Sequence, residues 1–151
     1  MKTSKTLSIR VETRTPETNA RAALAVCVFS DEPRLACAAR DTDARWREVC
    51  EQLIAGGEFK GEAETALLVH ARTADSTLRF LLVGLGERAD FNAHVLRRAS
   101  GVAARKARAA RVRRLSFLLP EDAGGIPTAQ LVGALAEGAH LGLYDNDFYK
   151  K

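Results

Sequence analysis

The chain has 151 residues, of which 46% are hydrophobic and 28% charged, and its formal net charge is +4 at pH 7. This length and composition predict one soluble globular domain with a single core. They exclude a membrane-spanning helix, because no apolar run approaches the roughly 18 residues that such a helix needs. The basic start of the chain lacks the hydrophobic region of a signal peptide. We therefore expect a cytoplasmic protein with no membrane partner.

The potential metal ligands are few and scattered. No pair of cysteines has the C-x-x-C spacing, and no pair of histidines has the H-x-x-x-H or H-E-x-x-H spacing of a metal site. We therefore expect reduced, structural cysteines and assign no metal ligand. The residues considered are Cys27, Cys37, Cys50, His70, His94 and His140.

The first part of the chain predicts two strands and then a helix. Residues 6–12 alternate apolar and polar side chains, which is typical of a strand with one buried face. Residues 23–30 form a continuous apolar run, as in a central strand. Residues 31–44 predict a loop or a short strand, because Pro33 breaks a helix.

A helix follows, because apolar residues recur with a 3.6-residue period from Trp46 to Ile54. Asp43 is its expected N-cap, and Gly56 and Gly57 are expected to end it.

The second part predicts a β-hairpin, a helix, a strand and a last helix. Residues 65–72 and 77–86 have strand patterns and are separated by turn-forming residues. Asp90 is the expected cap of a helix that runs from residue 91 to about 111, and residues 113–120 predict a strand. Thr128 is expected to cap a helix that ends near residue 142. The order β-β-α-β-β-α-β-α favours an α/β fold with a mixed sheet.

The stretch LLVGLGERADF, residues 81–91, matches a G-x-G-x-x-A dinucleotide fingerprint if Ala89 takes the third small position. A dinucleotide fold places this loop after its first strand, with an acidic residue about 20 positions later, and neither condition is met. Glu87 and Asp90 also occupy the helix N-terminus, where a phosphate would bind. We interpret the loop as a structural strand-to-helix turn, with phosphate binding as the alternative.

The helix after this turn is strongly basic. Arg97, Arg98, Arg105 and Arg108, together with Arg111, fall within one arc, opposite an apolar stripe toward which Lys106 points. We interpret the arc as a solvated face. The alternative is an anionic partner such as nucleic acid, bound without sequence preference, although no aromatic residues interleave with the arginines to stack on bases.

Three stretches, taken in order, resemble the N-terminal domain of the cytosol (leucyl) aminopeptidases, the M17 metallopeptidase family. GGEFKGEAETALLV resembles the family's G-[DE]-F-K-G segment, and LLVGLGERADF with its Ala-rich helix resembles its V-G-L-G-[EK] turn. LAEGAHLGLYDNDFYKK resembles its A-E-G-x-x-L-G-x-Y segment. The apolar end of the chain, with Leu141, Leu143 and Tyr144, suggests the edge of something larger.

The resemblance implies a macro-domain-like α/β fold, a mixed sheet flanked by helices, with residues 1–151 as one N-terminal, non-catalytic domain. It implies a following C-terminal catalytic domain that binds two divalent metals, manganese or zinc, and a homohexamer. That domain's metal ligands and catalytic residues have no counterpart in this sequence, so we assign no catalytic or cofactor-binding residue. A stand-alone macro-domain-like module that binds ADP-ribose or another anion is the alternative.

Overall fold

A computed structural model of the chain describes residues 22–36, 44–72, 77–120 and 123–143. The elements in chain order are β1 (Ala22–Phe29), β2 (Glu32–Leu35), α1 (Ala44–Ala55), β3 (Ala66–Arg72), β4 (Thr77–Gly86), the short 3-10 helix η2 (Arg88–Asp90), α2 (Ala93–Ala109), β5 (Arg114–Phe117) and α3 (Thr128–Leu143). None of the helices in these ranges is long and apolar enough to cross a membrane.

The five strands form one mixed sheet with β1 at its centre. β1 runs parallel to β4 on one side. On its other side it pairs in parallel with β5 and, at its end, antiparallel with β2. β3 pairs antiparallel with β4, so residues 66–72 and 77–86 are adjacent antiparallel strands, as the sequence predicts. The predicted α/β class, with a mixed sheet flanked by helices, is confirmed.

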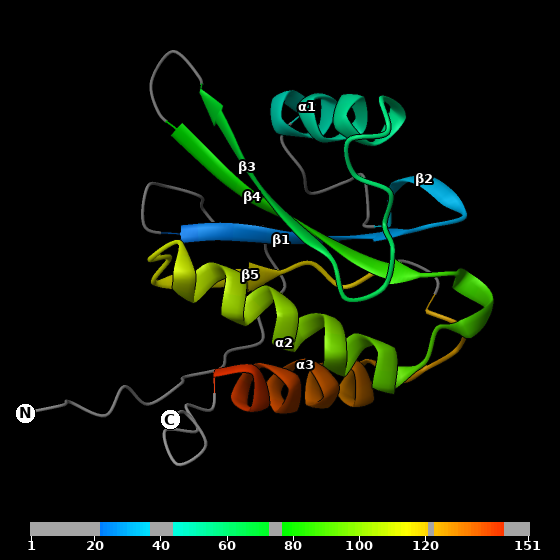
Figure 1. Ribbon diagram of the computed structural model, residues 1–151. Coiled ribbons are helices and arrows are strands. Elements are labelled where there is room, and N and C mark those ends of the chain that lie inside the picture. Colours follow the sequence, from blue (N-terminus) through cyan, green and yellow to red (C-terminus); the bar gives the residue numbers. More distant parts are fainter. Residues whose placement is uncertain (1–21, 37–43, 73–76, 121–122, 144–151) are drawn as a thin grey trace, which may run out of the picture.

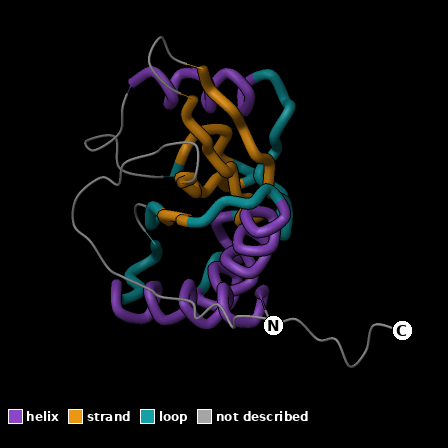
Figure 2. The backbone as a smooth tube through the Cα atoms, turned by 90° about the vertical axis from the view of Figure 1, so that its left-hand side faces the viewer, coloured by secondary structure: helices purple, strands orange, loops and turns teal. Residues whose placement is uncertain are grey.

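Helices cover both faces of the sheet (Figures 1 and 2). β1 supplies side chains to both layers. Leu24, Val26 and Val28 pack in one hydrophobic cluster with Cys50 and Ile54 of α1. The alternate residues Ala25, Cys27 and Phe29 pack in a second cluster, together with residues of α2 and α3 such as Leu96 and Leu131. Because every residue of β1 is buried, its sequence is a continuous apolar run rather than an alternating one.

α2 lies on the sheet, and α3 packs along α2, running in roughly the same direction (Figure 1). The contact is very close, because a methyl group at Gly138 of α3 would overlap the backbone carbonyl of Arg97 on α2. At the next turn of α3, a methyl group at Gly142 would overlap the backbone of Gly101. Small residues one turn apart therefore allow the two helices to approach closely, a pairing that was not predicted from the sequence.

The cap of α2 differs from expectation. α2 begins at Ala93, and its cap is Asn92, whose side chain accepts a hydrogen bond from the Val95 amide, so the prediction that Asp90 caps this helix is wrong. Asp90 instead ends the short helix η2, which occupies the first residues after the strand. Within residues 31–44 a short strand, β2, does form. The predicted strand at residues 6–12 and the predicted cap Asp43 lie outside the described residues.

Candidate functional site

The G-L-G turn at the end of β4 is a contact between backbones. The Gly84 amide donates to the Thr65 carbonyl at 2.8 Å, and the Gly86 amide donates to the Gly61 carbonyl at 2.9 Å. A side chain at Gly84 would overlap the Glu62 carbonyl and would come within 2.6 Å of Thr65 Oγ1. The glycine is therefore needed for the approach of residues 61–65. Phosphate binding in a glycine loop needs free amides, and both glycine amides of this turn are already engaged, as the interpretation of a structural turn predicts.

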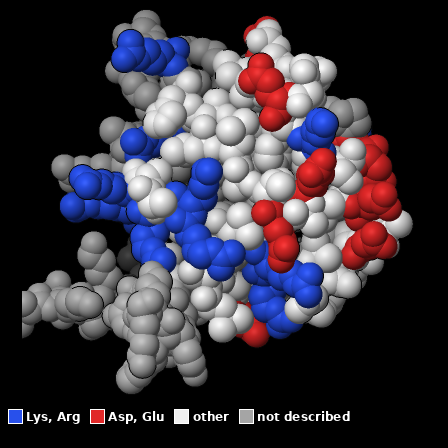
Figure 3. Space-filling view, in the orientation of Figure 1, with Lys and Arg blue, Asp and Glu red and all other residues white. Residues whose placement is uncertain are grey.

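The charge at this end of the sheet also opposes an anionic ligand. Open α/β sheets bind ligands beyond the carboxyl ends of their strands. In this chain the segments that follow β1 and β4, and the loop that contacts them, expose mainly carboxylates, which appear in red on the right of Figure 3. Like charges would repel a phosphate here. The exposed acidic residues are Asp31, Glu58, Glu62, Glu64, Glu87 and Asp90.

Arg88 directly follows Glu87 in the sequence, but its backbone amide and its side chain both have acidic partners already. Its backbone amide donates to Asp31 Oδ1 at 3.1 Å, and its side-chain Nε forms an ion pair with Glu32. Its guanidinium also lies 4.3 Å from the centre of the Phe29 ring, a cation–π contact. Arg88 therefore fastens the end of β4 to the β1–β2 turn.

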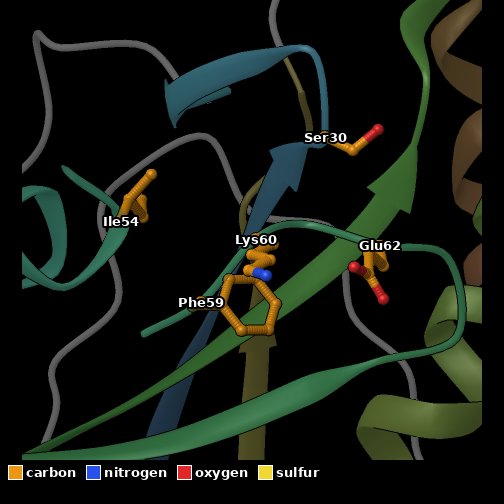
Figure 4. Close-up of a pocket in the computed structure, with 5 residues that line it drawn as sticks. All are labelled: Ser30, Ile54, Phe59, Lys60 and Glu62. Carbon is orange, nitrogen blue, oxygen red and sulfur yellow. The ribbon is translucent and has the colours of Figure 1, made fainter. Parts of the chain in front are cut away.

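A hollow of about 300 Å³ lies beside the end of β1 and is lined by Ser30, Ile54, Phe59, Lys60 and Glu62 (Figure 4). Ile54 and Phe59 are buried, whereas Lys60 and Glu62 are exposed at its rim. Among the described residues that line the hollow there is no histidine or cysteine that could serve as a base or nucleophile at neutral pH. Within the described ranges, no group of three His, Cys, Asp or Glu side chains could hold a metal ion.

The four arginines predicted to face solvent divide into two pairs. Arg98 and Arg105 are exposed on the free side of α2. Arg97 is half-buried, and its Nη1 lies 3.1 Å from Glu137 Oε1 of α3. Arg108 is exposed, but its Nη1 donates to the Leu143 carbonyl at 3.0 Å. The prediction that all four face solvent is therefore wrong for Arg97, because α3 occupies that side of the helix.

The free basic surface is displaced from the predicted arc. Lys106 is exposed beside Arg98 and Arg105, although its position was predicted to point toward the apolar stripe. Ala104, which lies two helical turns after Arg97 on the side of α2 predicted to face solvent, is instead buried. In Figure 3 the basic groups spread over the left and lower parts of the face.

The α2–α3 contact was not predicted from the sequence, although the spacing Gly138-x-x-x-Gly142 is present in EGAHLG. That spacing is an established signature of close helix pairs in membranes. Beside these glycines, Ser100 is a buried polar residue, and its Oγ donates to the Leu135 carbonyl at 2.6 Å. The segments that carry the family resemblance thus contact one another in the fold. Residues 61–65 contact the G-L-G turn, and α3 packs against α2.

Comparison with known proteins identifies the same family. The sequence profile of the cytosol aminopeptidase family, N-terminal domain, matches residues 25–151. A probable cytosol aminopeptidase of Acidobacterium capsulatum is 40% identical over 108 residues, which are 72% of this chain and 21% of that protein. One from Thermosynechococcus vestitus is 36% identical over 129 residues, which are 84% of this chain and 26% of that protein.

A solved structure, the bottromycin maturation enzyme BotP, superposes with a TM-score of 0.53 at 26% identity. The match covers 85% of this chain and 24% of BotP. The chain therefore spans about a quarter of the length of the proteins that it resembles.

Proposed function

Because the chain belongs to the cytosol aminopeptidase family, we propose that it forms the N-terminal, non-catalytic domain of a leucyl aminopeptidase, which releases N-terminal amino acids from peptides. The observation that carries this proposal is the match of the family's N-terminal domain to residues 25–151. The relatives are about four to five times as long as the matched segment, which leaves room in them for a catalytic domain. The family match favours this function over a stand-alone ADP-ribose module.

The residues that the structure describes do not fit a metal centre, since no three potential ligands among them lie together. We therefore assign no metal ligand and no catalytic step to them. We propose that two divalent metals, manganese or zinc, are held by the following domain, where they would polarise the scissile carbonyl and activate water. A structure of BotP has been solved in complex with Mn, which supports manganese.

The role left to this domain is assistance in assembly and in access to the active site. We propose a homohexamer of the full-length protein in the cytoplasm, with the protein's own catalytic domain as the principal partner. Nucleic acid is a secondary candidate partner for the exposed basic side of α2, which carries Arg98, Arg105 and Lys106.

A peptidase assay with two polypeptides tests the proposal. Residues 1–151 and the product of the longer reading frame are each incubated with a leucyl chromogenic peptide substrate and Mn²⁺ or Zn²⁺. We expect turnover by the longer polypeptide alone, and a chelator should abolish it. Chelator-sensitive turnover by residues 1–151 would contradict the proposal, as would a stop codon directly after Lys151.

A further inference from the structure

Strand β3 forms an open edge of the sheet, beside β4 (Figure 1). Among the described strands it pairs only with β4, in an unbroken antiparallel register from Ala66 to Arg72. Within the described ranges, the backbone groups on its other side have no hydrogen-bond partner. Unpaired amides and carbonyls at the edge of a sheet are a template for a further strand.

The direction of these free groups follows from the pairing with β4. The Gly84 amide donates to the Thr65 carbonyl at 2.8 Å, so these two residues form a hydrogen-bonded pair. In an antiparallel ladder such pairs alternate with pairs that exchange no hydrogen bond. Residues 67, 69 and 71 therefore direct their amides and carbonyls to β4. The residues that direct theirs to the open edge are Ala66, Leu68, His70 and Arg72.

This edge lacks the protection that the other outer strands have. Sheet edges are normally protected by short length, charged residues, proline or irregular pairing. β2 has four residues, EPRL, with Pro33 among them, and its pairing with β1 contains a register shift. β5 also has four residues and begins with Arg114. β3, in contrast, has seven residues, ALLVHAR, with no proline, and its one formal charge at neutral pH is the terminal Arg72.

The side chains of β3 are incompletely covered on both faces of the sheet. Leu67 packs against the hydrophobic cluster that includes α1, and Leu68 packs against the cluster that includes α2, but each is only half-buried. A neighbouring strand would cover both leucines, because side chains of paired strands contact one another on each face. Removal of this apolar surface from water would add to the backbone hydrogen bonds.

We propose that β3 pairs with β3 of a second copy of this chain, antiparallel and about a twofold axis. The inference deepens the assembly part of the proposed function, and it rests on that part rather than on the peptidase activity. An antiparallel pair of identical strands is self-complementary, because each contact occurs twice. With Leu68 opposite Leu68 of the second copy, Ala66 lies opposite His70, and the free amides and carbonyls of all these residues face one another.

Charge favours a second copy in this register. Glu64, just before β3, and Arg72, at its end, are both exposed, and neither forms an ion pair within the described ranges. With Leu68 at the twofold axis, Arg72 of each copy lies beside Glu64 of the other. A parallel pair of copies would place like charges together instead, which is destabilising.

Charge reversal combined with sedimentation equilibrium tests the pairing in residues 1–151 at low ionic strength, where exposed charges are least screened. We expect a reversible monomer–dimer equilibrium for the unchanged chain. Arg72→Glu should weaken dimerisation about tenfold, because two attractive pairs become repulsive at once. Glu64→Arg should weaken it similarly, whereas the double variant restores opposite charges and should dimerise like the unchanged chain. Arg105→Glu on the exposed side of α2 is the control for net charge and should have no such effect.

A proline substitution tests the backbone contact separately. His70→Pro removes an amide that faces the open edge, and the hydrogen bonds between β3 and β4 do not use that amide. Proline is tolerated in an edge strand at such a position, so the circular dichroism spectrum should remain that of the unchanged chain. Dimerisation should nevertheless fall at least about tenfold, since the change removes a hydrogen bond on each side of the axis.

Several results would overturn the inference. They are a chain of residues 1–151 that stays monomeric at every concentration or grows beyond a dimer, a double variant that does not recover, and a folded His70→Pro variant that dimerises normally. In the longer polypeptide, hydrogen-exchange protection of the Leu68 and His70 amides that does not change on dilution below the assembly's dissociation would identify a segment of the same polypeptide as the occupant, which would also overturn it.

The sedimentation experiment is independent of the peptidase assay. An active, metal-dependent longer polypeptide whose residues 1–151 stay monomeric contradicts the β3 interface alone. A dimer that responds to the charge reversals as expected, in a protein whose longer polypeptide has no peptidase activity, contradicts the proposed activity alone.

Discussion

Two parts of this molecule depend on glycine for close contact between backbones, but they are held together in different ways. At the carboxyl end of the sheet, residues 61–65 are joined to β4 by backbone hydrogen bonds from Gly84 and Gly86. Between α2 and α3 the hydrogen bonds come from side chains, those of Arg97, Ser100 and Arg108. A strand inside a hydrogen-bonded sheet cannot move alone, whereas a helix on the surface of the domain can shift as a unit. The same added methyl group should therefore lower the free energy of unfolding more at the sheet than between the two helices.

The largest loss of stability is expected for Gly84→Ala. The new methyl group would overlap the Glu62 carbonyl and approach Thr65 Oγ1, while β4 is fixed between β1 and β3. Overpacking of this kind costs about 3 kcal/mol of unfolding free energy, which urea denaturation followed by circular dichroism would measure. A loss smaller than that of Gly138→Ala would contradict the comparison.

Gly138→Ala should be less damaging, although the methyl group would overlap the Arg97 carbonyl just as severely. α3 can shift outward, and alanine gains about 1 kcal/mol over glycine within a helix, so we expect a net loss of about 2 kcal/mol or less. Hydrogen exchange should become faster in α3 and stay unchanged in α1, on the other face of the sheet. Uniform acceleration throughout the domain would show that α3 does not move as a unit.

Gly133→Ala provides the matched control in the same helix. No other atom lies near the position of its absent side chain, so the substitution should stabilise the domain by about 0.5–1 kcal/mol through helix propensity alone. A small rise in the melting temperature would be observed by calorimetry. Destabilisation would mean that Gly133 has a contact in solution that the structure does not contain.

The sequence predicted those elements whose signal is local. β1 was visible from its continuous apolar run, β3 and β4 from their strand patterns, and the helices from apolar periodicity and from residues expected at their ends, such as Gly56 and Gly57 after α1. The choice between Asp90 and Asn92 as the cap of α2 was not visible, because both residue types cap helices and the short helix η2 decides between them.

Prediction of the candidate sites failed where a partner element decides the outcome. Periodicity alone placed Arg97 on the solvent side, but α3 arrives there from about 40 residues later in the chain. The structural interpretation of the G-L-G turn agrees with the backbone hydrogen bonds of Gly84 and Gly86, and the sequence favoured it because Glu87 and Asp90 lie next to the turn. Its contact with residues 61–65 could not be predicted, since nothing local links a strand end to a preceding loop.

The central position of β1 has a consequence for synthesis on the ribosome. This strand carries no charge, glycine or proline, and its parallel partners β4 and β5 come much later in the chain, with Ala22 opposite Arg114. At translation rates of about 5–20 residues per second, the roughly 90 residues between these partners take about 5 to 20 s to appear. During that interval the part of β1 that pairs with β5 lacks this neighbour, so an eight-residue segment with the composition of an aggregation-prone strand is incompletely covered until β5 emerges.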